Sequence, residues 1–323
     1  MPTPIILGLD GGSTKTACVA LDATTPLATL QDAAALPVLG QAVTGASNWN
    51  SVGLETAFHN LAAALRSAAS DAGGHLDDVV AVCVGMSGVD RPEDRARAAD
   101  WLHTLLPGRV HVIDNDGVVA LACGAGGERY GVVIISGTGM IALGFNRAGQ
   151  RARAGGWGAL LGDGGSGYAI GAAILRAVTW AADGRGPATA LHDALLARLG
   201  LAQPEALVRW AYDRIEWQRF AELAPLALEC ATAGDAVAQA ILDQAVDDLA
   251  VAVETVARKL AFGEPFPLVT AGGLLRPGPF HDALARRITA TLPLAQVRHP
   301  AVEPALGAAL LALRAYHIQK AGA

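Results

Sequence analysis

Two glycine-rich turns, each between two apolar runs, constrain this chain more than any other feature of its sequence. The first apolar run, residues 5–9, ends in Asp10, and the turn over residues 11–14 leads into a second run at residues 17–21. This succession is typical of a β-hairpin. Glycines let backbone N–H groups approach an anion closely, and the hydroxyl of Thr14 adds a side-chain donor. The turn therefore indicates either a phosphate-binding hairpin or an ordinary turn between two strands.

The same pattern returns later in the chain. The apolar run 132–135 leads into a turn that contains Gly137, Thr138 and Gly139, and the run 140–145 follows. One such turn is ambiguous, because a chain with 38 glycines forms many of them. Two in corresponding places, each opening a strand–helix–strand stretch, indicate a duplicated α/β fold with a nucleotide between its halves.

Composition places the chain among globular proteins. Hydrophobic residues make up 52% and charged residues 17% of its 323 residues, which suffices for two domains and a large core. The net charge of −6 argues against a nucleic-acid surface, which needs a basic patch. No apolar run reaches the ~18 residues of a membrane span. The four cysteines lie far apart and no signal peptide precedes the first strand, so we expect a soluble cytoplasmic protein with reduced thiols.

Two common nucleotide-binding motifs are not supported. The chain contains no G-x-x-x-x-G-K-[ST], so it has no P-loop. A G-x-G-x-x-G match at residues 162–167 precedes a helix-like run, but no long apolar strand leads into it. Dinucleotide binding needs that strand, so this match carries little weight.

Apolar spacing predicts a mixed sheet flanked by helices in the first third of the chain. A helix is expected from Ser51, as its N-cap, to about Ala72. Other elements are expected as strands at 4–10, 16–22, 25–31, 79–85, 110–113, 132–136, 140–145, from Pro267 and at 295–298, and as helices at 92–106, through 168–262, at 279–291 and at 303–318. The region 168–262 is expected to be scaffold and subunit surface, and the last helix to pack back on the first domain.

Several polar residues stand where α/β proteins bind ligands, at the carboxyl ends of strands. Asp10 could hold a hydrated Mg²⁺. Asp114 and Asp116 follow the strand 110–113, and the dipole of the next helix would keep a carboxylate there ionised as a proton acceptor. The same two residues also fit a pair of helix-capping aspartates, which is common.

Three further loops are candidate ligand contacts. Asn48 lies in a polar loop as either a ligand donor or a turn residue. The run Gly155-Gly156-Trp157-Gly158 precedes Asp163, which could bind sugar hydroxyls or cap the next helix. The paired glycines Gly272 and Gly273 end a strand and could let a flat base lie against the backbone.

The order of these motifs resembles the N-acetylglucosamine kinase branch of the BadF/BadG/BcrA/BcrD ATPase family, within the actin, Hsp70 and sugar-kinase superfamily. The resemblance covers nearly the whole chain. It implies an α/β fold of two ribonuclease-H-like (actin-like ATPase) domains with a nucleotide cleft between them. Residues 1–117 plus 303–323 would form the N-terminal domain and residues 118–302 the C-terminal domain.

The resemblance also implies roles for individual residues. Asp10 would hold Mg²⁺ through water, and Asp116 would contact the sugar and act as general base, with Asp114 as the alternative. The phosphates would be bound by Gly11, Gly12, Ser13, Thr14, Lys15, Gly137, Thr138 and Gly139, the adenosine by Gly272 and Gly273, and the sugar by Asn48, Gly156, Trp157, Gly158 and Asp163.

The implied activity is ATP- and Mg²⁺-dependent phosphorylation of an amino sugar, N-acetylglucosamine at its 6-hydroxyl, by a homodimer. Two departures from the branch pattern leave the sugar open: Gly164 replaces a glutamate, and Gly167 replaces a larger residue of the animal enzymes. Both would remove bulk beside the sugar, so glucosamine, N-acetylmuramic acid and glucose are alternatives.

Two other functions are more remote. An activator ATPase of radical dehydratases would need cluster-binding cysteines, and Cys123 and Cys230 lack the surrounding pattern. A non-catalytic sugar sensor is disfavoured because no helix-turn-helix precedes residue 5.

Overall fold

The computed structural model describes residues 3–86, 89 and 91–322, and the chain divides into two compact units. The first unit comprises Met1–Gly131 and Arg298–Ala323, and the second comprises Val132–Val297. The divisions therefore fall at 131/132 and 297/298 rather than at the expected 117/118 and 302/303. Helix α4 (Asp116–Gly124) lies with the first unit because it packs on the last helix, α12 (Pro304–Gly322).

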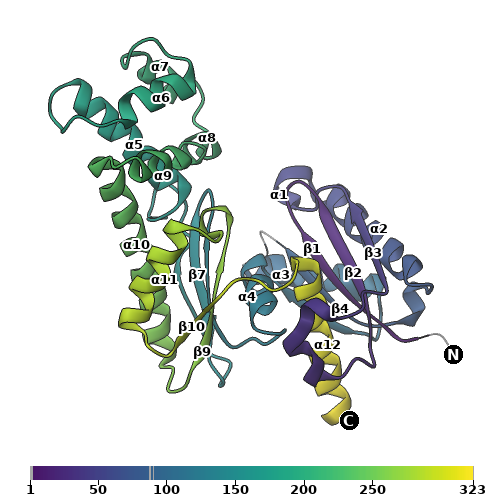
Figure 1. The fold of residues 1–323 in the computed structure, drawn as a ribbon. Coiled ribbons are helices and arrows are strands. Elements are labelled where there is room, and N and C mark those ends of the chain that lie inside the picture. The colour runs from purple at the N-terminus through teal and green to yellow at the C-terminus, as the bar shows by residue number, and fades with distance from the viewer. Residues whose placement is uncertain (1–2, 87–88, 90, 323) are drawn as a thin grey trace. The chain divides into compact units, whose positions relative to one another are not determined.

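The first unit is built on a mixed five-stranded sheet (Figure 1). Its order is β3-β2-β1-β4-β5, in which β1 runs antiparallel to β2 and parallel to β4, and β4 runs parallel to β5. The strands are β1 (Ile5–Gly11), β2 (Thr16–Asp22), β3 (Gly40–Thr44), β4 (Val79–Met86) and β5 (Val110–Asp114). The first hairpin and the parallel strands after it are confirmed.

The helices of the first unit differ from the expected elements in two places, at residues 25–31 and at Ser51. Besides α4 and α12 they are the 3₁₀ helices η1 (Leu27–Ala35) and η2 (Leu76–Asp78) and the helices α1 (Trp49–Val52), α2 (Leu54–Asp71) and α3 (Pro92–Leu105). The strand expected at 25–31 is wrong, because Leu27 and buried Leu30 lie one 3₁₀ turn apart in η1. Ser51 is not an N-cap, since α1 begins after Asn48 and Gly53, at φ 80°, separates α1 from α2.

The C-terminal helix returns to the first sheet, as expected. A Cβ atom at Gly8 of β1 would lie 2.0 Å from the backbone nitrogen of Ala309, so α12 touches the strand at a point where a side chain cannot fit. Ala305 and Ala309, the residues of α12 at this contact, are buried. This contact joins the last helix to the first strand of the chain.

The second unit repeats the strand order of the first. Its order is β10-β9-β6-β7-β8, with β6 parallel to β9 and β7 antiparallel to β8. The strands are β6 (Gly131–Ser136), β7 (Met140–Phe145), β8 (Arg151–Gly155), β9 (Phe266–Ala271) and β10 (Ala295–Arg298). Starting from β8, the succession matches that from β3 in the first unit. The duplicated fold expected from the two hairpins is therefore confirmed.

Helices fill the long connection between β8 and β9, as the periodicity of residues 168–262 predicts. They are α5 (Gly167–Ala182), α6 (Leu191–Leu199), α7 (Ala206–Asp213), α8 (Trp217–Ala221), α9 (Ala224–Thr232) and α10 (Ala236–Leu260), and η3 (Gly273–Leu275) and α11 (Pro279–Thr291) follow β9. Helix α10 packs on β7, β8 and α11 (Figure 1).

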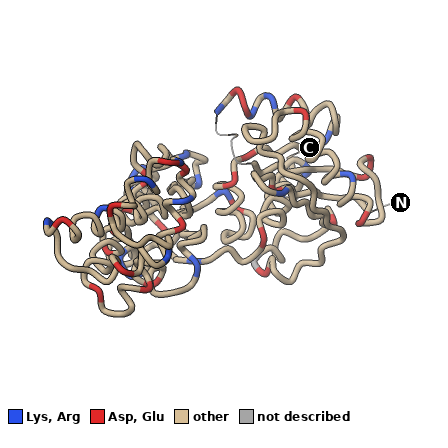
Figure 2. The backbone as a smooth tube through the Cα atoms, turned by 90° about the horizontal axis from the view of Figure 1, so that it is seen from above, with Lys and Arg blue, Asp and Glu red and all other residues tan. Residues whose placement is uncertain are grey.

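Charges of both signs are interspersed along the backbone of each unit (Figure 2). Within the described ranges, no helix is long and apolar enough to cross a membrane.

Candidate functional site

The parallel strands of the first unit bring its candidate carboxylates to one edge of the sheet. The register pairs Asp10 with Gly85 and Gly85 with Asp114. Helix α4 then begins at Asp116, directly after its N-cap Asn115, whose side chain accepts from the backbone N–H of Val118. The expected edge site is thus assembled, and Asn115 rather than an aspartate caps the helix.

The pKa of the Asp10 carboxyl group is raised from 3.8 to about 6. Burial is the largest cause, the nearby charges of Asp116 and Glu303 act in the same direction, and Lys15 opposes them. The carboxylate form is therefore less favoured than in water and would be stabilised by a cation.

The structure separates the two candidate bases. Asp114 is buried and forms ion pairs with Arg95, at 3.3 Å, and with Arg129. Asp116 is exposed, and its Oδ1 accepts from the backbone N–H of Gly117 at 2.9 Å. A carboxylate held between two guanidinium groups is a poor proton acceptor and cannot reach a substrate, whereas an exposed one can. This geometry favours Asp116.

The first turn is held by hydrogen bonds at its base, and the residues at its tip are exposed. The N–H of Gly12 donates to the carbonyl of Lys15 at 3.0 Å, and the N–H groups of Ser47 and Asn48 donate to the carbonyl of Gly12 at 3.0 and 3.1 Å. Thr16 Oγ1 donates to Ser47 Oγ at 2.7 Å. Ser13, Thr14 and Lys15 are exposed, so their side chains and N–H groups are accessible to a ligand beside Asn48.

The second turn packs against the loop that begins helix α5. The N–H of Gly167 donates to the carbonyl of Gly137 at 2.8 Å, and the N–H of Tyr168 donates to the carbonyl of Thr138 at 3.2 Å. A Cβ at Gly139 would lie 2.7 Å from Asp163 Oδ2, so that carboxylate rests directly on the turn.

Asp163 also organises the tryptophan loop. Its Oδ1 accepts from the N–H groups of Trp157 and Gly158, each at 3.1 Å, and the residue is buried. Ser166 is the N-cap of α5, so the alternative in which Asp163 caps that helix is wrong. One carboxylate therefore links the expected phosphate turn to the expected sugar loop, while the Trp157 side chain stays 68% exposed.

The paired glycines after β9 join the same group. Gly272 has φ 97°, and a Cβ there would lie 2.2 Å from the carbonyl oxygen of Ser136, which precedes the second turn. Gly273 has open space where its side chain would stand. The structure thus brings Gly137, Gly139, Asp163 and Gly272 together within the second unit.

The two glycine departures do not open space for a sugar substituent, contrary to expectation. A Cβ at Gly164 would lie 2.7 Å from Asp248 Oδ2 on α10. A Cβ at Gly167 would lie 3.0 Å from both the Cβ of Ala221 and the carbonyl oxygen of Gly137. Protein atoms already occupy both places, so these glycines permit close packing.

Two residues that contact the candidate site could not be found from the sequence. Gln218, on α8, accepts a hydrogen bond from the hydroxyl of Thr138. Arg153 donates to the carbonyl of Gly156 at 2.9 Å, and its guanidinium lies 5.6 Å from the centroid of the Trp157 ring. Gln218 lies 80 residues from Thr138, and no local pattern marks it.

A cavity of about 220 Å³ lies between α9, α10 and α11. Its lining includes Thr232, Gln239, Asp243, Pro279 and Phe280. Two of its lining residues, Pro279 and Phe280, follow Gly273 in the chain.

The residues present fit Mg²⁺ held mainly through water. Among residues 3–86, 89 and 91–322, no three His, Cys, Asp or Glu side chains are grouped as a metal site. Mg²⁺ commonly takes one or two carboxylates together with waters and substrate phosphates. The disfavoured charge of Asp10 suits such a partner.

Comparisons with known proteins identify the family. The BadF/BadG/BcrA/BcrD ATPase family matches residues 7–312. The chain is 40% identical over 326 residues to N-acetyl-D-glucosamine kinase of Dictyostelium discoideum, covering 97% of this chain and 99% of that one. It is 31% identical over 311 residues to N-acetylmuramic acid/N-acetylglucosamine kinase of Clostridium acetobutylicum, covering 95% and 97%.

A solved structure from Chromobacterium violaceum, provisionally described as an N-acetylglucosamine kinase, matches with a TM-score of 0.68 and 27% identity, covering 96% of this chain and 99% of that one. The hexokinase of the ROK family from Thermus thermophilus shares the fold, with a TM-score of 0.59 at 20% identity, covering 98% and 100%. The chain therefore belongs to the BadF/BadG/BcrA/BcrD ATPase family and has two domains of the actin-like ATPase fold.

Proposed function

We propose that the protein transfers the γ-phosphoryl group of ATP to the 6-hydroxyl of N-acetylglucosamine. The observation that carries the proposal is the position of Asp163, which contacts the turn Gly137–Gly139 with one oxygen and the loop of Trp157 and Gly158 with the other. The identity to an N-acetyl-D-glucosamine kinase along the whole chain supports the substrate.

The residues of the first unit supply the acid–base chemistry. Asp116 accepts the proton of the attacking hydroxyl as the phosphoryl group is transferred, and Asn48 binds the sugar beside it. A general base contributes roughly 10²–10⁴-fold to the rate, and positioning with charge neutralisation contributes most of the rest. Asp114 stays paired with Arg95 and Arg129 and holds β5 and α3 in place.

Backbone N–H groups carry most of the phosphate binding. The exposed Thr14 and Lys15 add a hydroxyl donor and a positive charge in the first unit, and Thr138 adds a hydroxyl in the second. Mg²⁺, held near Asp10 through water, would neutralise charge on the phosphate oxygens. The adenosine lies against Gly272 and Gly273, with the base in the cavity beside Phe280.

N-acetylmuramic acid is the second candidate substrate. The kinase from Clostridium acetobutylicum, which is named for both sugars, is 31% identical over nearly the whole chain. Glucosamine and glucose remain further alternatives. The exposed Trp157, Leu160 and Leu161 form an apolar rim to the loop, which favours a sugar with an N-acyl group over these two.

A single panel tests the proposal. ADP release would be followed with Mg-ATP and N-acetylglucosamine, N-acetylmuramic acid, glucosamine or glucose, and the product identified by its phosphorus–proton NMR couplings. We expect the highest kcat/KM with N-acetylglucosamine and a phosphate on its 6-oxygen. ADP release that no sugar accelerates would contradict the kinase proposal, and a phosphate on another oxygen would contradict the position.

A further inference from the structure

We propose that Asp248 of helix α10 is a positioning residue for the sugar loop, because its carboxylate fills the volume that a side chain at position 164 would occupy. The inference rests on the proposed function, because it concerns the loop assigned to the sugar.

Gly164 and Asp248 compete for one volume. A Cβ at Gly164 would lie 2.7 Å from Asp248 Oδ2, 2.9 Å from its Cγ and 3.1 Å from its Cβ. Real Cβ atoms do not approach other heavy atoms at 2.7 Å. A side chain at position 164 therefore fits only if the Asp248 side chain moves.

The neighbouring residue fastens the loop to the same turn of α10. Gly165 has φ 77°, and a Cβ there would lie 2.6 Å from the carbonyl oxygen of Ala245 and 2.5 Å from Cγ of Leu249. The backbone of residues 164–165 thus lies directly on residues 245–249. Asp163 immediately precedes this contact, so the helix sets the position of the carboxylate that binds Trp157 and Gly158.

The Asp248 side chain is itself held in its orientation. Gln244 Nε2, one turn earlier, donates to Asp248 Oδ1 at 3.0 Å, and Oδ2 is left on the side of the loop. Asp248 is half-buried, which strengthens its electrostatic effect relative to that of a solvated carboxylate.

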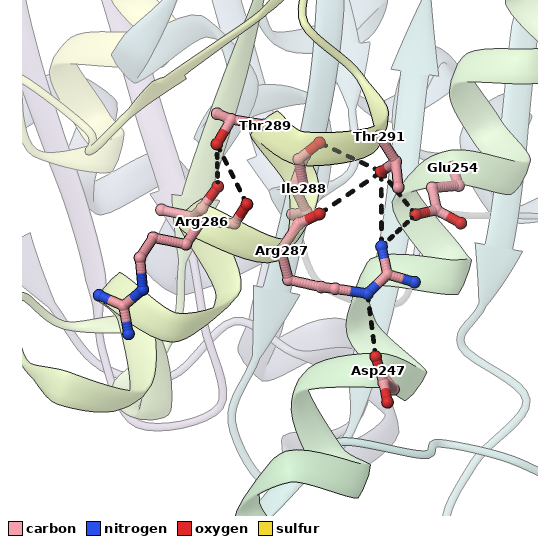
Figure 3. A network of polar contacts seen from close by, with 8 residues as sticks. Asp247, Glu254, Arg286, Arg287, Ile288, Thr289 and Thr291 are labelled. Atoms are coloured by element: carbon pink, nitrogen blue, oxygen red, sulfur yellow. Dashed lines mark hydrogen bonds and ion pairs between the residues drawn. The ribbon is translucent and has the colours of Figure 1, made fainter.

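The adjacent aspartate on α10, Asp247, contacts another helix. Asp247 Oδ1 pairs with Arg287 Nε at 3.0 Å, and Glu254 Oε1 pairs with Arg287 Nη1 at 2.7 Å, so these residues fasten α10 to α11 (Figure 3). Successive helix positions point about 100° apart. Asp247 therefore provides a matched control: the same residue type on the same helix, facing another partner.

Moving the carboxylate from position 248 to position 164 tests the inference. We expect Gly164→Glu to raise the KM for the sugar at least tenfold and to lower Tm, because its carboxylate meets Asp248. We expect Asp248→Ala to raise the sugar KM about threefold to tenfold, with kcat and the KM for ATP within twofold. The double variant Gly164→Glu/Asp248→Ala should recover to within about threefold of the parent, because one carboxylate again occupies the volume.

Asp247→Ala is the matched control for Asp248→Ala. Asp247→Ala should leave the sugar KM within twofold, whatever its effect on Tm. A double variant as impaired as Gly164→Glu alone, or an Asp248→Ala variant that changes Tm but not the sugar KM, would overturn the inference. If the parent phosphorylates no sugar, the proposed function fails, whereas non-additive Tm values for the two substitutions would still report the contact.

Discussion

The two units share a strand order but hold their glycine-rich turns in different ways. In the first unit the tip residues Ser13, Thr14 and Lys15 are exposed, and the turn is supported from behind by Ser47 and Asn48. In the second unit the turn is half-buried under Gly167 and Tyr168 at the start of α5. The duplicated frame positions both turns, and the segments inserted after each hairpin decide how they are supported.

The candidate carboxylates of the two units also differ in their surroundings. Asp10 and Asp116 of the first unit stand next to each other at strand ends, where the pKa of Asp10 is raised to about 6. Asp163 of the second unit accepts two backbone N–H groups, which fix its position in the tryptophan loop. The first unit thus suits proton transfer and cation binding, and the second suits positioning.

The largest effect should come from Asp116. We expect Asp116→Asn to lower kcat by roughly 10²–10⁴-fold, because the general base is lost, while the affinities for ATP and sugar change little. Steady-state kinetics and calorimetric binding would measure the two effects. Asp114→Asn is the control: it should lower the free energy of unfolding by about 3 kcal/mol, because it leaves Arg95 and Arg129 without their charge partner. A loss of kcat confined to Asp114→Asn would transfer the base to that residue.

A smaller, separate effect is expected in the second unit. Asp163→Asn should raise the sugar KM about 10- to 100-fold, because hydrogen bonds to a charged acceptor contribute about 1.5–3 kcal/mol. Initial rates at varied sugar and fixed saturating Mg-ATP would measure it. If the KM for the sugar stayed unchanged while kcat fell as in Asp116→Asn, the division of tasks between the units would be wrong.

Asp10 should show a trade between stability and activity. Its folded pKa, about 6, lies above the unfolded value of 3.8, so ionisation of Asp10 destabilises the fold: the stability that this group contributes is full below pH 4 and is lost as the pH rises through 6. The full shift corresponds to about 3 kcal/mol, and partial exposure reduces this to about 1–2 kcal/mol. Asp10→Asn should therefore unfold at higher urea than the parent at pH 8, with the gain shrinking toward pH 4.

The same variant should also lose Mg²⁺-dependent activity. The stabilisation that Mg-ATP confers on the parent, seen as a rise in Tm, should be smaller in Asp10→Asn. A variant that is less stable than the parent at pH 8 would contradict the burial argument for Asp10.

The smallest effect concerns the cysteines. Burial raises the pKa of Cys83 and of Cys123 to about 12 in the first unit, so almost no thiolate is present at pH 8. Burial also raises the pKa of Cys230 in the second unit, but 7% of that residue is exposed. Iodoacetamide followed by peptide mass spectrometry should therefore label Cys230 before the other two. Equal labelling would mean that the first unit opens as readily as the second.

Much of the frame is predictable because it depends on local patterns. Apolar runs such as 79–85 identify buried strands, and the repeated Gly-rich turns identify the duplication. The strand expected at 25–31 is wrong, because Leu27 and Leu30, three residues apart, would face opposite sides of a strand but lie on one side of a 3₁₀ helix. The packing of α4 on α12, which groups α4 with the first unit, joins residues nearly 200 positions apart, and no local pattern in the sequence reports such a contact.

The family and the two-domain fold can be predicted from the amino-acid sequence because they depend on short motifs in a set order, and the same motifs supply the candidate residues for phosphate and sugar binding. Tertiary contacts supply the rest: Asp114 is paired with Arg95 and Arg129 whereas Asp116 is exposed, Ser166 caps α5, and Asp248 lies against Gly164. Each of these features depends on which distant side chain fills a particular volume or neutralises a particular charge, and spacing along the chain does not carry that information.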